Sequence, residues 1–203
     1  DFKLTVAMSS TGTRVAVAKT DVFDNDYVEV YEESANGTWT RTGNQIAGVV
    51  DGRGKGLFMA SDGRRVAIWD GTNVNIYEET VSGNWTQLGQ GILAPSHQFA
   101  DVPSIAFSSN GVRVAVGDEI NAQVRVYKYE GNGWAQIGNT IAGANNFGFT
   151  IAMSADGTQV AIGTHSFATH EKVQLYGESN GAWSPVGSSI TMSNSYKEDH
   201  VSM

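Results

Sequence analysis

The 203-residue chain lacks several features that would narrow its function. It has no cysteine, so disulfides and thiolate metal sites are excluded. No apolar run approaches the roughly 20 residues that span a bilayer. Basic residues are few, 13 Lys and Arg against 21 Asp and Glu, and the net charge of −8 argues against a nucleic-acid partner. No signal-peptide pattern is visible, and a first residue of Asp1 favours a processed or trimmed start.

What the chain does have is an internal repeat of about 50 residues. A short apolar segment recurs four times and begins a fifth copy, with steps of 51, 48, 46 and 50 residues. The five segments are Thr5–Met8, Gly56–Met59, Ser104–Phe107, Thr150–Met153 and His200–Met203. A period of this length is typical of solenoids, arrays and propellers.

Each repeat continues with a glycine turn and a second apolar strand. Asp-Gly and Asn-Gly pairs favour positive φ angles, so we expect two-residue type I′ hairpins. The turn glycines are Gly12, Gly63, Gly111 and Gly157. The strands that follow combine small and β-branched residues, which suits burial on both faces. They begin at Arg14, Arg65, Arg113 and Gln159.

The second half of each repeat carries aromatic residues in a fixed register. A third strand alternates apolar and polar residues, which indicates one buried and one wet face. It contains Tyr31, Tyr77, Tyr127 and Tyr176. After another glycine turn, a fourth strand begins with Trp39, Trp85, Trp134 and Trp183, and an isoleucine follows seven residues later. We expect these aromatic residues to pack between repeats rather than to form a carbohydrate platform.

Four short antiparallel strands per repeat predict an all-β fold, a β-propeller of four-stranded blades. The rivals are a long β-sandwich and a β-solenoid. We predict a single array over residues 1–203, with repeats at about 1–51, 52–99, 100–145, 146–195 and a further unit starting at 196–203. Four blades that close on themselves and a piece of a larger propeller both stay open, since an unclosed piece exposes apolar edges.

The fourth repeat resembles a known propeller family. Phe147–Gly157, Val160–Gly163, Val173–Tyr176 and Trp183 are similar to an FG-GAP-like repeat of the "SxDGxxVAxG" and "VxVYxxxxGxW" variant, found in secreted or surface proteins of marine bacteria and of algae such as diatoms. The resemblance covers essentially the whole chain and implies a propeller for adhesion, ligand display or assembly, usually without catalysis. Integrin-type members carry a calcium-binding loop where this chain has only a short turn. The resemblance therefore does not imply a calcium site in these turns.

Chain direction places the short glycine turns on one face and the longer connections on the other. The longer connections differ in length and chemistry, and variable loops on a rigid scaffold are where recognition usually occurs. We therefore expect a protein or glycan partner on that variable-loop face. Asp21, Asp24 and Asp26 are a candidate calcium group, although no other repeat copies them. The alternative interpretation of each loop is a solvated connection.

Catalytic patterns are absent from the sequence. The four histidines have no metal-ligand spacing, and the adjacent carboxylates lie on opposite faces of their strands. We predict no enzyme activity, no catalytic residue, no metal and no cofactor. Asn36 and Asn84 fit the N-glycosylation sequon and lie in turns, where glycans are accepted.

The leading hypothesis is a non-enzymatic extracellular or cell-surface propeller that binds a protein or glycan. A structural subunit of a filament, coat or larger complex, built by self-association, is the first alternative. A propeller-type carbohydrate-active enzyme is the second, and it requires carboxylates or histidines that converge on the central channel.

Overall fold

The computed structural model describes residues 5–20, 26–47, 56–94, 102–144, 146–164 and 171–192. These residues form strands and turns without a helix, and they assemble into four antiparallel sheets that follow one another along the chain. We call these sheets blades 1 to 4. The described part of the chain therefore contains no helix that could cross a membrane.

The two end blades each contain four strands. Blade 1 consists of β1 (Thr5–Met8), β2 (Arg14–Thr20), β3 (Asp26–Glu33) and β4 (Trp39–Ala47). Blade 4 consists of β15 (Phe147–Met153), β16 (Gln159–Thr164), β17 (Glu171–Ser179) and β18 (Ala182–Met192).

In the two middle blades the outer strand is interrupted, so two short pieces pair with the third strand. Blade 2 consists of β5 (Leu57–Met59), β6 (Arg65–Trp69), β7 (Asn73–Glu79), β8 (Trp85–Gln87) and β9 (Ile92–Leu93). Blade 3 consists of β10 (Ile105–Phe107), β11 (Arg113–Asp118), β12 (Gln123–Tyr129), β13 (Trp134–Gln136) and β14 (Ile141–Ala142).

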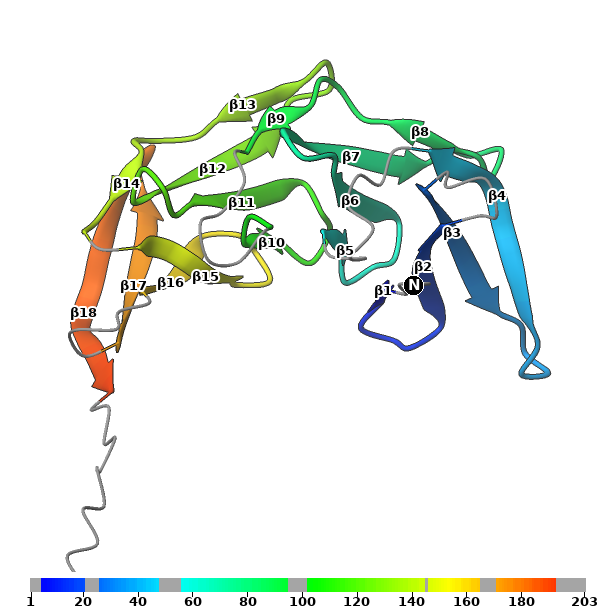
Figure 1. The fold of residues 1–203 in the computed structure, drawn as a ribbon, viewed down its shortest axis with the longest axis horizontal. Helices are drawn as coiled ribbons and strands as arrows, with labels where there is room; N and C mark the ends of the chain where they lie inside the picture. The colour runs from blue at the N-terminus through cyan, green and yellow to red at the C-terminus, as the bar shows by residue number, and fades with distance from the viewer. Residues whose placement is uncertain are drawn as a thin grey trace, which may run out of the picture.

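The blades stand side by side in an open arch (Figure 1). The first strand of each blade lies on the concave side, the outermost strand lies on the convex side, and blades 1 and 4 form the two separate ends. The predicted fifth unit, 196–203, lies outside the described residues. Four blades in this arrangement do not close on themselves.

The glycine turns differ from the predicted type I′ hairpins. Each of the four turn glycines has a positive φ, but the residue before it does not. In the first turn the amide of Gly12 donates to the carbonyl of Ser9 over 3.0 Å. The Asp or Asn before the glycine instead accepts a hydrogen bond from the amide two residues on, as Asp62 does from Arg64 over 2.9 Å. An Asx turn of this kind satisfies the backbone locally, so only the glycine needs the left-handed conformation.

The hydrophobic core lies between the blades rather than inside one of them. Three clusters fill the three interfaces, and each contains residues from two consecutive blades. In the first interface Ala16, Val28 and Val30 of blade 1 meet Val66 and Ile68 of blade 2. Because successive residues of a strand point to opposite faces, Ala67 belongs to the next cluster along the arch. The small alanine allows neighbouring blades to approach closely.

Candidate recognition face

The two faces of the arch are built differently. We call the face with the turns between first and second strands and between third and fourth strands the hairpin face. The opposite face, with the connections from second to third strand and from blade to blade, is the loop face. The sequence predicts recognition on the loop face.

The hairpin face is occupied by contacts that repeat between blades. The amide of Ser10 donates to the carbonyl of Ser61 over 2.9 Å, and that of Ser109 donates to the carbonyl of Ala155 over 2.8 Å. An arginine from each of blades 1 to 3 also lies against the turn glycine of the next blade. Arg14 meets Gly63, Arg65 meets Gly111 and Arg113 meets Gly157, so closely that a Cβ on the glycine would come within 2.8, 2.8 and 2.6 Å of the arginine Cδ.

These arginines also connect the blades electrostatically. Arg14 pairs with Glu79 of the next blade at 2.5 Å, and Arg113 approaches Glu178 at 3.5 Å. Arg65 instead lies over the ring of Tyr129, 5.8 Å from its centroid. All three arginines therefore have a neighbour in the following blade, and this explains why the residue recurs in the sequence.

Three of the four repeating tryptophans join their blade to the preceding one. Trp134 donates its indole N–H to the carbonyl of Leu88 over 2.8 Å, and Trp183 donates to that of Ile137 over 3.0 Å. The indole N–H of Trp85 reaches the hydroxyl of Thr42 over 3.4 Å. All three side chains are buried. A buried indole needs such an acceptor, so these residues serve packing between blades.

Trp39, in contrast, is 42% exposed, because no other blade of the described residues packs on that side of blade 1. At the other end Ile190 is 65% exposed, whereas its counterparts Ile46, Ile92 and Ile141 are buried. The tryptophan and isoleucine positions of the repeat are thus exposed at one end of the arch each, although the equivalent residues in the other blades are buried.

The loop face differs from blade to blade at two equivalent positions. One is at the end of the second strand, and the other is a polar residue near the start of the third strand. We call these the loop-end positions: Lys19 and Glu29, Asp70 and Asn75, Asp118 and Arg125, Thr164 and Gln174.

In blade 1 the loop-end positions form an ion pair. Lys19 lies 2.5 Å from the carboxylate of Glu29, which also accepts hydrogen bonds from Tyr31, Arg41 and Gln45. Burial acts to raise the pKa of Glu29, but the hydrogen bonds from Lys19, Gln45 and its other donors outweigh burial and lower that pKa to about 2. The Glu29 carboxylate is therefore ionised at neutral pH.

Blades 2 and 3 place a carboxylate where blade 1 has lysine. Asp70 accepts a hydrogen bond from Asn75 over 2.7 Å, and Asp118 accepts one from Arg125 over 3.3 Å. Burial acts to raise the pKa of both carboxyls, but hydrogen bonds from backbone amides and from Asn and Gln side chains lower it overall. A carboxyl with a lowered pKa is poorly suited to act as a general acid at neutral pH. Blade 4 has the neutral residues Thr164 and Gln174 at the same positions.

An exposed apolar side chain lies on the described part of the loop face. Ile120 lies in the turn between β11 and β12 and is 56% exposed, next to the buried Asp118 and Glu119. Ala122 in the same turn has a φ of 51°. The amide of Asn121 donates to the carboxylate of Asp118 over 3.1 Å, which fixes the turn beneath the exposed isoleucine.

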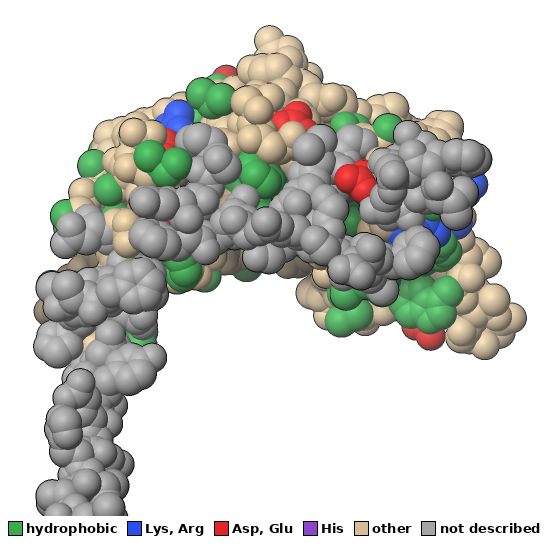
Figure 2. Space-filling view, viewed as in Figure 1, with side chains coloured by type: hydrophobic (Ala, Val, Ile, Leu, Met, Phe, Trp, Pro, Cys, Tyr) green, Lys and Arg blue, Asp and Glu red, His purple; other side chains and the backbone are tan. Residues whose placement is uncertain are grey.

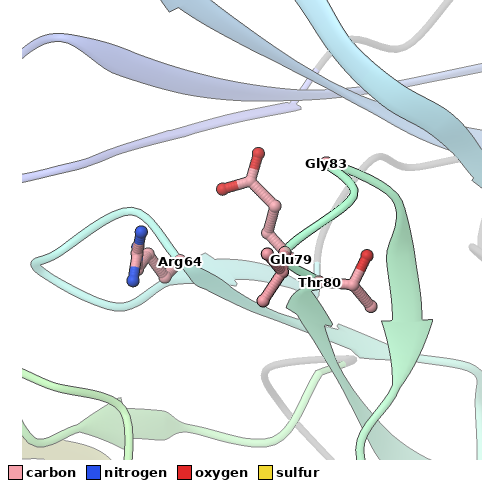
Figure 3. A pocket seen from close by; sticks show the side chains of 5 residues that line it. Arg64, Glu79, Thr80 and Gly83 are labelled. Atoms are coloured by element: carbon pink, nitrogen blue, oxygen red, sulfur yellow. The ribbon is translucent and has the colours of Figure 1, made fainter.

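A shallow polar depression of about 280 Å³ lies on the hairpin face, lined by Arg64, Glu79, Thr80, Val81 and Gly83 (Figure 3). The carboxylate of Glu79 already pairs with Arg14 of blade 1. The depression thus shares its main charged group with a contact between blades, so it is a weaker candidate than the loop face.

Several residues that the sequence analysis singled out lie outside the described residues. These are Asp21 and Asp24 of the candidate calcium group, and all four histidines. Asp26, the third member of that group, begins β3. Among the described residues, no cluster of three or more His, Asp or Glu side chains is arranged to hold a metal ion.

The two predicted glycosylation sites are exposed on hairpin turns. The side-chain oxygen of Asn36 accepts a hydrogen bond from the amide of Thr38 over 3.2 Å. Asn84 lies directly before the buried Trp85. Glycosylation at both asparagines stays a prediction.

Sequence reasoning missed the loop-end positions. Their two members are five to ten residues apart and come together only when the second and third strands pair. The sequence nevertheless contained a signal for these positions. The second strands of the four repeats align without gaps, and the residue at their end changes in charge, from Lys19 to Asp70 and Asp118 to Thr164.

Comparisons with known proteins identify the fold. No protein-family model matches the chain, and no curated protein matches its sequence. The structure is similar to the β-propeller domain of the Trilobed protease from Pyrococcus furiosus, with a TM-score of 0.56, 8% identity, and coverage of 93% of this chain and 58% of that one.

Two further solved structures are similar over most of this chain. One is a functionally unknown protein from Desulfotomaculum acetoxidans, with a TM-score of 0.62, 15% identity, and coverage of 90% of this chain and 54% of that one. The other is the periplasmic gluconolactonase of Pseudomonas aeruginosa, with a TM-score of 0.52, 20% identity, and coverage of 90% and 55%. The chain thus spans little more than half of these proteins.

The prediction of an all-β propeller built of four-stranded antiparallel blades is confirmed. The prediction that the chain is not an enzyme is contradicted, because a structure with the same fold is a gluconolactonase. The sequence-based exclusion depended on missing catalytic motifs, and a propeller can assemble a site from residues of different blades that no local motif reveals.

Proposed function

We propose that this chain is a β-propeller scaffold that recognises a protein or glycan partner through its loop face, outside the cell or at the cell surface. The observation that carries the proposal is the contrast between the faces. The hairpin face repeats the same contacts between blades, whereas the loop-end positions carry Lys19, Asp70, the buried Asp118 and Thr164 in order along the arch.

The charges of the loop face are held in place before any partner arrives. The carboxylates of Asp70 and Asp118 each accept hydrogen bonds from their own turn, and Lys19 is paired with Glu29. Fixed side chains lose little conformational entropy on binding, and this pre-organisation favours affinity. Exposed Ile120 adds apolar surface in the same region.

The FG-GAP-like character of the repeats and the extracellular location belong to this proposal. They are supported by the "SxDGxxVAxG" pattern, best developed in the fourth repeat, and by the exposed sequons at Asn36 and Asn84. A decrease in the mass of the native protein on treatment with an N-glycosidase is the expected result. An unchanged mass would contradict glycosylation, though not recognition.

A matched pair of exposed apolar residues tests the binding face. Ile120 projects from the loop face, and Val81 projects from a turn of the hairpin face, where it is fully exposed. The labelled protein is applied to an immobilised panel of glycans and secreted proteins. We expect Ile120→Ser to weaken binding to the retained partners, whereas Val81→Ser should bind as the wild type does. The opposite result, or equal binding by both variants, would contradict the loop-face assignment.

A second candidate function is suggested by the similarity to the Pseudomonas aeruginosa gluconolactonase: hydrolysis of a sugar lactone. Identity of 20% supports the shared fold alone, so the activity needs its own test. Acid release from glucono-1,5-lactone above the spontaneous rate, measured at constant pH, would favour this candidate. A rate equal to the spontaneous one would remove it.

A further inference from the structure

Four Asn-Gly pairs lie in turns of the hairpin face, and such a pair has a chemistry of its own. The pairs begin at Asn36, Asn110, Asn132 and Asn180. The backbone nitrogen of the glycine can attack the side-chain amide carbon of the asparagine, because glycine has no Cβ to obstruct the approach. Asparagine is among the thermolabile residues for this reason. Local hydrogen bonds decide how readily each pair reacts, since both reacting groups also take part in turns.

The pair that begins at Asn110 is held at both reacting groups. The amide of Gly111 donates to the carbonyl of Ser108 over 2.9 Å. The side-chain oxygen of Asn110 accepts hydrogen bonds from the hydroxyl of Ser108 over 3.0 Å and from the amide of Val112 over 3.1 Å. Gly111 also lies against Arg65 of the preceding blade. These bonds and this contact must all be disturbed before the pair can react.

The first and the last pair also have a hydrogen-bonded glycine amide. Gly37 donates its N–H to the carbonyl of Ser34 over 2.9 Å. Gly181 donates its N–H to the carboxylate of Glu178 over 2.9 Å, and Asn180 before it has a left-handed φ of 52°. A hydrogen-bonded amide must be released before its nitrogen can attack, so the reaction is slowed at both pairs.

The pair of Asn132 and Gly133, in the turn between β12 and β13, is different. The turn is held on either side of the pair: the hydroxyl of Tyr129 donates to the carbonyl of Gly131 over 2.8 Å. The amide of Glu130 donates to the carbonyl of Gly133 over 3.0 Å. Among the described residues, however, the side chain of Asn132 and the amide of Gly133 have no hydrogen-bond partner. Both reacting groups are therefore free in the folded chain.

Water, the other reactant, also reaches this pair. Asn132 is exposed. The convex side of the arch, where β13 lies in Figure 1, consists mostly of uncharged polar side chains and backbone in the space-filling view (Figure 2). Hydrolysis completes the reaction, so access of water matters as well as the free amide.

We infer that Asn132 is the residue at which this chain deamidates first, and that the product loosens the contact between blades 2 and 3. The nitrogen of Gly133 bonds to the side-chain carbonyl carbon of Asn132. The side-chain nitrogen leaves as ammonia, which takes the proton of the Gly133 amide. Water then opens the resulting succinimide ring at either carbonyl. One opening gives aspartate, and the other gives isoaspartate, in which the main chain runs through the side-chain carbon.

Isoaspartate at this position acts on a contact between blades. Gly133 lies so close to blade 2 that an added Cβ would come within 2.7 Å of Gln90 Oε1. An added Cβ on Gly89 would come within 3.0 Å of Gly133 Cα. The next residue, Trp134, is buried and donates its indole N–H to the carbonyl of Leu88 over 2.8 Å. A main chain lengthened by a methylene, with a new carboxylate beside it, displaces Gly133 from this close packing.

This inference is independent of the proposed recognition function. The turn between β12 and β13 belongs to the hairpin face, whereas recognition is assigned to the loop face. The protein used to test it must not pass through the N-glycosidase treatment proposed above, because an N-glycosidase itself can convert a glycosylated asparagine to aspartate.

Ageing of the full chain in warm, mildly alkaline buffer tests the site. Peptide mapping by mass spectrometry follows each of the four pairs with time and separates aspartate from isoaspartate. We expect Asn132 to convert at least roughly fivefold faster than the other three, where at least one hydrogen bond must break first. The same incubation of the urea-unfolded chain is the control, and there the four rates should be alike. An Asn132 that is no faster in the folded chain, or equally favoured in urea, would overturn the inference.

Two variants test the effect on the contact between blades. Asn132→Gln removes the site without a change in charge, since the longer side chain cyclises far more slowly. Asn180→Gln, in the corresponding turn of blade 4, is the matched control. We expect ageing to lower the thermal unfolding temperature of the wild type and of Asn180→Gln, whereas that of Asn132→Gln should stay near its unaged value. Equal changes in all three proteins, or a wild type that contains isoaspartate and unfolds at its unaged temperature, would overturn the link to blades 2 and 3.

Discussion

The interior and the ends of the arch contain the same residues in different environments. Between blades 3 and 4, Trp183 is buried at 4% exposure and donates a hydrogen bond to Ile137. At the free end of blade 1, Trp39 occupies the same place in the repeat and is 42% exposed. The difference teaches that the repeated tryptophan is buried only where a neighbouring blade packs against it, as expected when each unit contacts its neighbours alone.

Residues at the interfaces between blades vary less from repeat to repeat than residues at the loop-end positions. Residues that face a neighbouring blade are nearly constant, because each interface must fit the next. Residues at the loop ends vary in charge without disturbing those interfaces, as the pairs Lys19 with Glu29 and Asp118 with Arg125 show. Variation on the loop face is therefore available for recognition.

The largest expected effect comes from the tryptophans. Trp183→Ala removes a buried indole and leaves a cavity, so we expect a loss of about 3–5 kcal/mol in the free energy of unfolding. Trp39→Ala, made at the free end, should cost less than about 1 kcal/mol. Urea unfolding of the two variants and the wild type measures both losses. Equal losses would mean that the end blade is not free in solution.

The turn glycines should give a smaller contrast. Alanine at Gly157 or Gly12 is strained by about 1–2 kcal/mol, since both have positive φ angles of 72° and 75°. Only at Gly157 would the new Cβ also meet carbons of the preceding blade, with Arg113 Cβ and Ser108 Cβ at 3.1 Å. We expect Gly157→Ala to cost about 1–3 kcal/mol more than Gly12→Ala.

Thermal or urea unfolding of the two glycine variants checks this expectation, and Gly12→Ala is the built-in control for backbone strain. A loss at Gly12 as large as at Gly157 would show that the turn conformation alone explains the requirement for glycine. The contact between blades would then be unimportant at this position.

The repeat made much of this fold predictable. Period, alternation and the register of Tyr and Trp were sufficient for four-stranded antiparallel blades, because each repeat folds by the same local rules. The exposure of Trp39 and Ile190 was not predictable in this way, since a residue's burial depends on a neighbouring blade that its own repeat does not encode.

The turns and the site were harder to predict for related reasons. Asn-Gly and Asp-Gly pairs suit two kinds of turn, and the choice here depends on side-chain hydrogen bonds such as that from Arg64 to Asp62. The loop-end positions combine residues from two strands, so their pairing, as in Lys19 with Glu29, emerges only after the sheet forms. The absence of catalytic motifs also misled the exclusion of enzyme activity, because propeller sites draw residues from several blades.

The smallest expected effect concerns acid stability at the loop end of blade 1. The folded-state pKa of Glu29 is lowered to about 2, below its ordinary value of 4.5. A lowered pKa stabilises the folded state above the unfolded pKa, and this contribution is lost as the pH falls from about 5 toward 2. Glu29→Gln should therefore be less stable than the wild type at pH 7, and the gap should narrow on acidification through that range. Urea unfolding across this pH range measures it, and Glu33→Gln, on the exposed end of β3, controls for the loss of one negative charge. A gap that stays constant with pH would show that Glu29 acts through packing and not through its charge.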